Sequence, residues 1–259
     1  MNRFRIIYKF VLHFFSARNT KGYSVHSPFV FQFTRSVLCE KHSFYTFQTI
    51  EHLRDTLKKD KRVLNIKDFG TGEDRNETIS DIAKKSLKSA VYGQLLFRIV
   101  RYFKARNILE LGTSLGVTTC YLAASSSEIS CVSLEGCPLI AEVAKENIKN
   151  AGFKNIEIVV GNIDTTLAEV LNDMPKLDVV FIDANHRYEA ILSYFELCMT
   201  KVQNSTVMVI DDIYWSGEME LAWQKIKNYP MVTSTIDLFH VGIVFFNPDL
   251  HKKHYKMRY

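Results

Sequence analysis

Acidic side chains and one histidine follow short apolar segments in the second half of the chain. Glu135 ends one segment, Asp183 and His186 follow another, and Asp211 and Asp212 follow a third. If these segments are neighbouring parallel strands, their carboxyl ends meet at one edge of the sheet, where such sheets bind ligands. The three aspartates could hold a hard divalent cation such as Mg²⁺. Alternatively, Asp183 contacts a cofactor while Asp211 and Asp212 cap the following helix.

His186 is the candidate for proton transfer in this group. A neutral imidazole can remove a proton from a hydroxyl near pH 7. The same side chain could serve as a metal ligand or as a polar wall of the site. Tyr214 and Trp215, just past Asp211, either line a substrate pocket or pack against the following helix.

A glycine-containing loop precedes these acids in the chain, where residues 110–119 read ELGTSLGVTT. Gly112 and Gly116 allow a sharp turn and close approach of a ligand, and the next helix begins with exposed N–H groups. Ser114 stands where a dinucleotide-binding loop has its middle glycine, which disfavours NAD. Glu135 lies where an acid accepts hydrogen bonds from ribose hydroxyls, and Asn162 could reach an adenine edge. The three segments together predict nucleoside binding.

Strand and helix patterns alternate from residue 107 onward, which predicts an α/β fold with a doubly wound, mostly parallel, seven-stranded Rossmann-like sheet. The expected strands are residues 108–111, 129–134, 156–160, 177–182 and 206–210. Residues 231–238 and 241–246 predict a terminal hairpin with Phe239 and His240 at its turn, so the last strand should be antiparallel.

The composition predicts three regions. Residues 1–104 form a mainly helical, aromatic cap with substrate or dimer contacts, 105–250 the cofactor-binding domain and 251–259 a basic tail that frays. One helix is expected over residues 78–103, and residues 68–76 read as a loop. Several aromatic-segment side chains either face the substrate or simply pack, namely His26, Phe29, Phe31 and Phe33.

The N-terminal segment, residues 4–15, has apolar residues at helical spacing. It either docks on its own domain or on a second copy, giving a homodimer, or it lies on a membrane surface. In the last case, peripheral contact through residues 1–18 would place basic side chains at the headgroups, namely Arg3, Arg5, Lys9 and Arg18. No segment is long and apolar enough for a transmembrane span.

The overall composition is that of an ordinary globular protein, with 259 residues of which 47% are hydrophobic. A formal net charge of +5 is too small to indicate a nucleic-acid binder. The five cysteines form no C-x-x-C pair, which favours buried reduced thiols in a cytoplasmic protein.

Residues 107–247 resemble class I S-adenosylmethionine-dependent methyltransferases. Within that class they are most similar to metal-dependent O-methyltransferases of the catechol and caffeoyl-CoA type, and the whole chain also resembles uncharacterised bacterial methyltransferase-like proteins. The motif 110–116 (ELGTSLG) matches the glycine loop of the family, Glu135 its ribose-binding acid, and residues 161–163 its adenine-side turn. Asp212 stands where the metal triad of the family has Asn, and His186 where it has a catalytic Lys.

The resemblance implies an S-adenosylmethionine-dependent methyltransferase (EC 2.1.1.-) that acts on a small-molecule acceptor, at oxygen, with a divalent metal. Its implied catalytic residues are His186 and Asp183, and its metal ligands are Asp183, Asp211 and Asp212. The implied cofactor contacts are Glu110, Gly112, Thr113, Ser114, Gly116, Glu135, Gly136, Asn162, Ile163 and Asp183. The alternatives are a catalytically silent nucleoside-binding module of the same fold and an NAD-dependent oxidoreductase.

Overall fold

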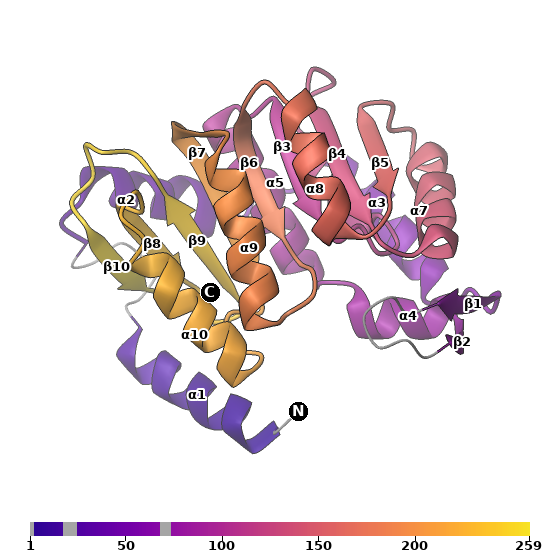
Figure 1. Cartoon of the computed structure of the whole chain (residues 1–259), viewed down its shortest axis with the longest axis horizontal. Helices are drawn as coiled ribbons and strands as arrows, with labels where there is room; N and C mark the ends of the chain where they lie inside the picture. Colours follow the sequence, from indigo (N-terminus) through magenta and orange to yellow (C-terminus); the bar gives the residue numbers. More distant parts are fainter. Residues whose placement is uncertain (1–2, 18–24, 68–73) are drawn as a thin grey trace. The chain divides into compact units, whose positions relative to one another are not determined.

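The computed structural model describes residues 3–17, 25–67 and 74–259. The chain divides into two compact units, which are described separately (Figure 1). The first unit combines Met1–Glu40 with Asp173–Tyr259, and the second unit is the continuous stretch Lys41–Asn172.

The second unit contains a parallel three-stranded sheet and an antiparallel hairpin. Strands β3, β4 and β5 lie side by side, with Leu111 opposite Leu134 and Glu135 opposite Val160. The carboxyl ends of all three strands therefore meet at one edge. The elements, in chain order, are α3 (Tyr45–Leu57), β1 (Val63–Lys67), β2 (Asp74–Thr78), α4 (Ile79–Ser86), α5 (Ala90–Phe103), β3 (Asn107–Leu111), α6 (Val117–Ala123), β4 (Ser130–Glu135), α7 (Pro138–Asn150), β5 (Ile156–Val160) and α8 (Ile163–Asp173), which ends at the boundary.

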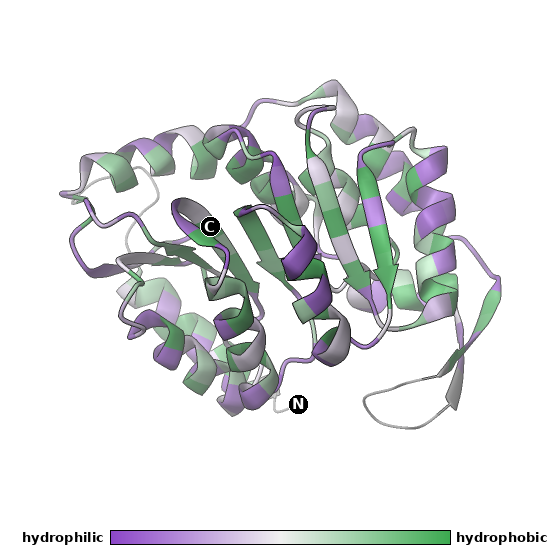
Figure 2. Cartoon of the chain, turned by 45° about the horizontal axis from the view of Figure 1, so that its top comes forward, coloured by the Kyte–Doolittle hydropathy of each residue, from purple (hydrophilic) through white to green (hydrophobic). Residues whose placement is uncertain are grey.

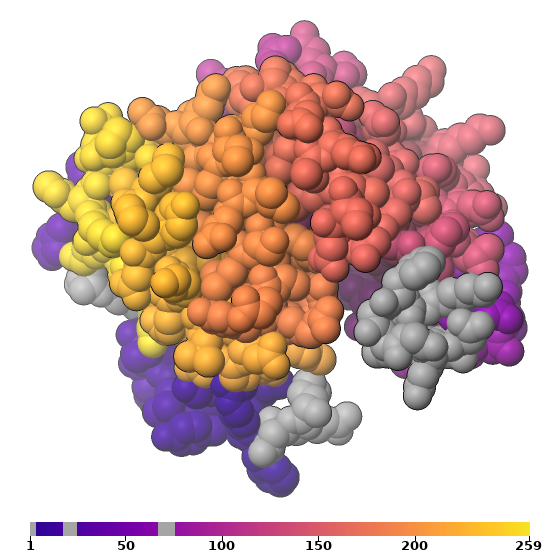
Figure 3. All heavy atoms as spheres, viewed as in Figure 1, coloured from indigo at the N-terminus to yellow at the C-terminus, as the bar shows by residue number. Residues whose placement is uncertain are grey.

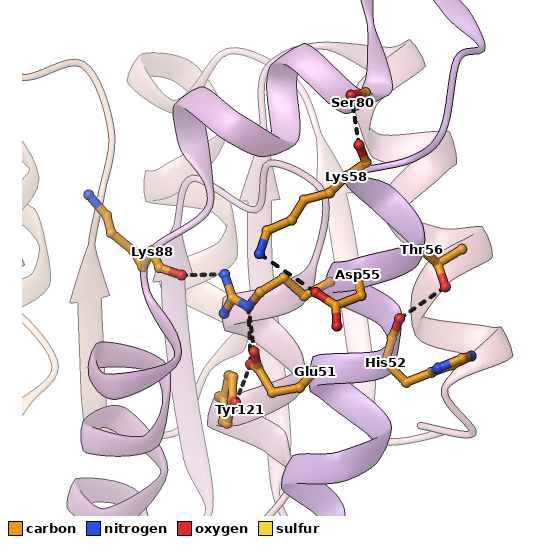
Figure 4. A network of polar contacts seen from close by, with 9 residues as sticks. Glu51, His52, Asp55, Thr56, Lys58, Ser80, Lys88 and Tyr121 are labelled. Carbon is orange, nitrogen blue, oxygen red and sulfur yellow. Dashed lines mark hydrogen bonds and ion pairs between the residues drawn. The ribbon is translucent and has the colours of Figure 1, made fainter.

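A polar network ties α3 to α6 inside the second unit (Figure 4). The hydroxyl of Tyr121 donates to Glu51 at 2.6 Å, and Arg54 Nε donates to the same carboxylate at 3.0 Å. Arg54 also donates to the carbonyl of Lys88. Because the buried guanidinium is both paired and hydrogen-bonded, its desolvation is offset. The network fixes α3 against the helix that follows the glycine loop.

The first unit contains a mixed five-stranded sheet in the order β10-β8-β9-β7-β6. Strands β6 and β7 are parallel, whereas β9 is antiparallel to both β7 and β8. The elements, in chain order, are α1 (Arg3–Ser16), α2 (Pro28–Phe33), a π-helical turn (Thr34–Leu38), β6 (Leu177–Ile182), α9 (Tyr188–Met199), β7 (Val202–Asp211), α10 (Gly217–Lys227), β8 (Ser234–Asp237), β9 (Val241–Phe245) and β10 (Lys253–Lys256). Hydrophobic colour runs along the strands in Figure 2, as expected for strands packed between helices.

The predicted α/β class and the antiparallel terminal hairpin are confirmed, while three local expectations are wrong. Residues 251–259 were expected to form a frayed tail, but they include strand β10, which is parallel to β8. Burial of Tyr255 and Met257 holds this segment in place. This strand makes eight in β3–β10, against the seven predicted. The expected helix over residues 78–103 is two helices, α4 and α5, separated by residues 87–89. Of the expected loop 68–76, residues 68–73 lie outside the described part, and 74–76 belong to β2.

The aromatic segment before residue 40 packs within the first unit. The rings of Phe29 and Phe33 meet Phe245 edge-to-face at 5.2 and 5.4 Å. His26 and Phe31 are exposed. Ordinary packing thus accounts for Phe29 and Phe33. Within the described residues, no helix has the length and apolar character needed to cross a membrane.

Candidate active site

The glycine loop at the end of β3 adopts the backbone conformation that its sequence predicts. Gly112 and Gly116 have φ values of 100° and 81°, in the left-handed region that favours glycine. Gly116 directly precedes α6, and a Cβ there would approach the Ile148 side chain to 3.2 Å. Ser114 also has a positive φ of 48°. The loop therefore turns tightly around the N-terminus of α6, where unpaired N–H groups favour a polar ligand.

Glu135, at the end of β4, is fixed by this loop. Its Oε2 accepts a hydrogen bond from Ser114 N at 2.8 Å, and its Oε1 accepts one from Cys137 N at 2.9 Å. Burial raises the pKa of Glu135, and the backbone N–H groups of Cys137, Ser114 and Gly136 oppose the rise. A Cβ on Gly136 would meet no atom within 4 Å, so the backbone beside the acid is open. The carboxylate is thus held in place with acceptor positions to spare.

Glu110 and Thr113 are placed differently from the prediction that they contact a cofactor. The Glu110 side chain is fully buried, and its Oε2 accepts hydrogen bonds from Thr119 and from Ser133, the latter at 2.6 Å. Thr113 is also buried, with its hydroxyl 2.5 Å from that of Ser133. These side chains connect β3, β4 and α6 beneath the loop. These hydrogen bonds therefore stabilise the backbone of the glycine loop.

The turn after β5 completes the edge of the second unit. Gly161 has a φ of 155°, and its N–H donates to the Glu135 carbonyl at 3.0 Å. The exposed Asn162 accepts a hydrogen bond from Asp164 N at 3.0 Å through its Oδ1. Ile163 is buried at the start of α8. The structure therefore brings Ser114, Glu135 and the turn at Gly161 together, as predicted.

The first unit places a second polar group at the ends of β6 and β7. Ile182 lies opposite Ile210 in the parallel register, so Asp183 and Asp211 leave neighbouring strands at the same edge. Asp211 is buried, with 1% of its surface exposed. The side chains of Asp183 and Asp212 are partly exposed, at 18% and 22%.

Both loops of this group contain left-handed residues other than glycine. Asn185, His186 and Asp212 have φ values of 64°, 41° and 51°. Such conformations cost about 1–2 kcal/mol each and cluster at functional sites. The loop after β6 is held by hydrogen bonds from Asn185 to the Tyr194 hydroxyl at 3.2 Å and from Arg187 to Asn185 at 2.8 Å. The position of the His186 side chain thus depends on a strained backbone conformation at Asn185 and His186.

His186 faces the carboxylates of this group. Its Nε2 lies 3.5 Å from Oδ1 of Asp183 and 3.7 Å from Oδ2 of Asp212. Among the described residues, this buried nitrogen finds no hydrogen-bond partner. One potential ligand atom from each of Asp183, His186 and Asp211 lies within 4.8 Å of the others. A donor set of two carboxylates and an imidazole, with an unsatisfied nitrogen directed into it, fits a divalent cation.

A buried cluster behind the loop after β7 was missed by the sequence analysis. Tyr214 is buried and donates to Oδ2 of Asp237 at 2.6 Å, while His13 Nε2 lies 3.0 Å from Oδ1 of Asp237. Hydrogen bonds from His13, Tyr214 and Phe239 lower the pKa of Asp237 despite the opposing effect of its burial. No sequence signal pairs residues so far apart. Trp215, by contrast, is 45% exposed and its ring centroid lies 6.5 Å from that of His186.

The α/β fold thus places polar groups at the carboxyl ends of its parallel strands, where such sheets bind ligands. Residues 109–213 match the family described as "Methyltransferase domain". The resemblance to class I S-adenosylmethionine-dependent methyltransferases, of the O-methyltransferase type, is thus confirmed.

The curated relatives carry O-methyltransferase names. The chain is 33% identical over 131 residues to a catechol O-methyltransferase from Mycobacterium tuberculosis, which covers 50% of this chain and 58% of that protein. It is 31% identical over 154 residues to the O-methyltransferase imqG from Aspergillus flavus, covering 56% of this chain and 62% of the relative. The matches thus span about six-tenths of the length of these relatives.

Solved structures support the fold at lower sequence identity. An O-methyltransferase from Bacillus cereus, in complex with SAH, aligns with a TM-score of 0.56 and 21% identity over 83% of this chain and 96% of that one. The O-methyltransferase TomG from Streptomyces achromogenes, in complex with SAM, aligns with a TM-score of 0.58 and 19% identity over 79% and 91%. These likenesses establish a Rossmann-like α/β fold.

Proposed function

We propose that the protein is an S-adenosylmethionine-dependent methyltransferase that methylates a hydroxyl of a small-molecule acceptor, assisted by a divalent metal. The observation that carries the proposal is the fixed Glu135 carboxylate beside the glycine loop, in a segment that matches the methyltransferase domain family. The names of the relatives, both O-methyltransferases, support oxygen as the acceptor atom.

The second unit would bind the cofactor. Glu135 would accept hydrogen bonds from the ribose hydroxyls, as acids at this position do in nucleoside-binding folds. The open backbone at Gly136 leaves space beside the ribose, and the turn at Asn162 would contact the adenine. Ser114 in place of a glycine disfavours NAD, because the loop then lacks the close approach that a pyrophosphate needs.

The first unit would bind the acceptor and the metal. Asp183 and Asp211 would hold the cation, with Asp212 beside them. A bound divalent cation lowers the pKa of a coordinated hydroxyl and orients it. The exposed ring of Trp215 near His186 would form one wall for an aromatic or otherwise apolar acceptor.

In the proposed methyl transfer, His186 would act as the general base that accepts the proton of the acceptor hydroxyl. Bound S-adenosylmethionine would supply the methyl group: a C–O bond to the acceptor would form while the C–S bond would break with its electron pair on sulfur, which would leave S-adenosylhomocysteine. The hydroxyl proton passes to Nε2 of His186, whose lone pair is not occupied by a hydrogen bond. The imidazolium that results is stabilised by the carboxylates of Asp183 and Asp212 at 3.5 and 3.7 Å.

Calorimetry with S-adenosylmethionine, S-adenosylhomocysteine and NAD tests the cofactor assignment. We expect both sulfur nucleosides to bind and NAD not to bind. Binding of NAD alone would overturn the proposal, and it would favour an oxidoreductase. Binding of the sulfur nucleosides without methyl transfer to any acceptor, in a screen of catechols and other hydroxylated aromatics with a labelled methyl donor, would favour a silent binding module.

Metal dependence is tested by the same transfer assay with EDTA and then with added Mg²⁺ or Mn²⁺. We expect EDTA to abolish transfer and either ion to restore it, because two carboxylates without a cation would repel the developing oxyanion. Equal rates in EDTA and in Mg²⁺ would remove the metal from the proposal.

The cysteines and the net charge support a proposed cellular compartment and a proposed class of partner. The five cysteines are free thiols, four of them buried, which supports a cytoplasmic location. A small-molecule acceptor needs no nucleic-acid contact, in keeping with the mild net charge of +5.

A further inference from the structure

Helix α1 lies on the first unit through its polar side. Arg5, Lys9 and His13 are spaced four residues apart and therefore share one stripe of the helix. The carboxylate of Glu220 lies 2.6 Å from Arg5 Nη2 and 2.6 Å from Lys9 Nζ. His13 is 5% exposed and contacts Asp237. Figure 1 shows α1 beside α10, the helix that carries Glu220.

The opposite side of α1 is hydrophobic and exposed. At about 100° per residue, its members cover an arc of roughly 200° that excludes the polar stripe. We call this surface the α1 apolar arc; it comprises Phe4, Ile7, Tyr8, Phe10, Val11, Leu12, Phe14 and Phe15. Phe4 is 85% exposed and Phe15 is 77% exposed. A helix that only stabilises its own fold buries its apolar stripe and exposes its polar one, so the orientation of α1 is reversed.

The size of the arc matches that of a protein interface. A fully exposed aromatic side chain offers about 200 Å², and five of the eight residues are aromatic. Weighted by their exposed fractions, the eight side chains present roughly 800 Å² of mostly apolar surface. This is above the roughly 300–600 Å² of the largest patch on a typical monomer and equals the roughly 800 Å² that each partner buries in a standard interface. Figure 3 shows α1 as an indigo ridge at the surface of the first unit.

The charges around the arc favour a protein partner over a membrane. Helices that lie on membranes place Lys and Arg at the headgroups beside the apolar face. In α1, the side chains of Arg5 and Lys9 both bind Glu220 instead. The nearby Arg258 is also engaged, since its Nε donates to the Phe14 carbonyl at 2.8 Å. These cations are therefore directed away from an anionic surface.

We propose that the α1 apolar arc is the interface of a symmetric homodimer, in which the arcs of two copies pack against each other. A two-fold axis places the same patch on both partners, so an interface of this kind must be self-complementary. The arc meets that condition because its own side chains are uncharged, and the Arg258 guanidinium beside it lies 4.2 Å from the Phe14 ring centroid at the edge of the arc. The rings supply area with few rotatable bonds, which keeps the entropy of association low.

Sedimentation velocity of the full chain over 1–100 µM tests the proposal, with the paired variant Val11→Glu/Phe15→Glu. We expect the natural chain to sediment as a dimer, near twice the mass of 29.9 kDa. The paired variant should be monomeric, with a dimer Kd weakened at least 100-fold, because two copies place four carboxylates in one apolar contact. Val91→Glu is the matched control, since Val91 is 54% exposed on α5 outside the arc. That variant should dimerise like the natural chain.

The variants alter exposed positions, and circular dichroism with thermal melting checks that they fold. A natural chain that stays monomeric at 100 µM would overturn the proposal, and so would a folded paired variant that dimerises like the natural chain. Flotation with vesicles of neutral and of anionic phospholipid adds a second arm. Vesicle binding by a monomeric natural chain, lost in the paired variant, would assign the arc to membranes instead. None of these outcomes depends on methyl transfer.

Discussion

Replacing Glu135 by glutamine is the sharpest test of the proposed cofactor site. Each carboxylate oxygen already accepts one backbone hydrogen bond, Oε2 from Ser114 and Oε1 from Cys137. The Gly136 N–H also interacts with this carboxylate. Because a carboxylate has about four lone-pair positions, acceptor capacity remains for the ribose hydroxyls. Glutamine removes the charge and turns one oxygen into an NH₂ group. That group faces a backbone N–H and cannot accept a hydroxyl proton.

The expected loss of affinity follows from these contacts. A hydrogen bond to a charged group contributes about 1.5–3 kcal/mol. The variant loses one such bond outright and weakens the other, so we expect a loss of about 3 kcal/mol. Because 1.4 kcal/mol corresponds to a tenfold change, the Kd for S-adenosylhomocysteine should rise about 100-fold.

Isothermal titration calorimetry with S-adenosylhomocysteine measures this change. Glu157→Gln is the control, because Glu157 is exposed on the neighbouring strand β5, and its Kd should stay within about twofold of the natural value. If Glu135→Gln binds within threefold of the natural chain, Glu135 does not hold the ribose and the assignment of this edge is wrong.

The same residue predicts a pH dependence. Burial raises the pKa of Glu135 above its ordinary value, so the folded chain takes up the proton at higher pH than the unfolded chain does. The group therefore lowers stability as pH rises from its ordinary pKa to its raised pKa, and the effect is constant above that window. Ribose hydroxyls donate best to the ionised acid. Cofactor affinity should consequently fall as pH drops through the raised pKa, and this dependence should vanish in Glu135→Gln.

Three further changes test the first unit. Asp211→Asn should weaken Mn²⁺ binding at least tenfold, since a buried carboxylate ligand is lost; unchanged affinity in an electron paramagnetic resonance titration would contradict this. His186→Gln should lower kcat about 100-fold or more, whereas a loss confined to Mn²⁺ affinity would make His186 a ligand. Gly242→Ala should destabilise the chain by about 2 kcal/mol and lower Tm by roughly 6 °C, because its Cβ would lie 2.6 Å from the buried Trp223 ring. Gly217→Ala, whose Cβ would make an ordinary van der Waals contact with Arg5 Nη2 at 3.9 Å, should melt like the natural chain, and a Tm loss equal in both would show that the ring contact is irrelevant.

The sequence predicted the parts of the fold that local patterns encode. The apolar runs of β3 to β7 and the two-residue turn at Phe239 and His240 led to the correct sheet class and terminal hairpin. The positive φ values at Gly112 and Gly116 follow from glycine itself. Glu135 was found because its position relative to the loop is a property of the strand–helix–strand unit.

What the sequence did not predict depends on contacts between distant residues. The amphipathic pattern of α1 identified a helix, but its orientation depends on Glu220 and Asp237, more than 200 positions away. Strand β10 was missed because Lys253–Lys256 has a mostly polar sequence, and it pairs with β8 through its backbone, the buried Tyr255 and a hydrogen bond between the side chains of His254 and Thr235. Glu110 was expected at the cofactor, yet its side chain is buried and its Oε2 accepts hydrogen bonds from Thr119 and Ser133 inside the unit. Hydropathy patterns do not specify such partners.

The division of the chain has a consequence for how its specificity can change. The second unit, with the glycine loop, Glu135 and the turn at Gly161, is one uninterrupted stretch, Lys41–Asn172. The aspartates, His186 and Trp215 all lie outside it, in Asp173–Tyr259. Under the proposed function, the segments that would determine the acceptor can therefore be exchanged between relatives without altering a residue of the stretch that would bind the nucleoside. A chimera that keeps residues 41–172 should retain its cofactor affinity while it takes on the acceptor preference of the donor.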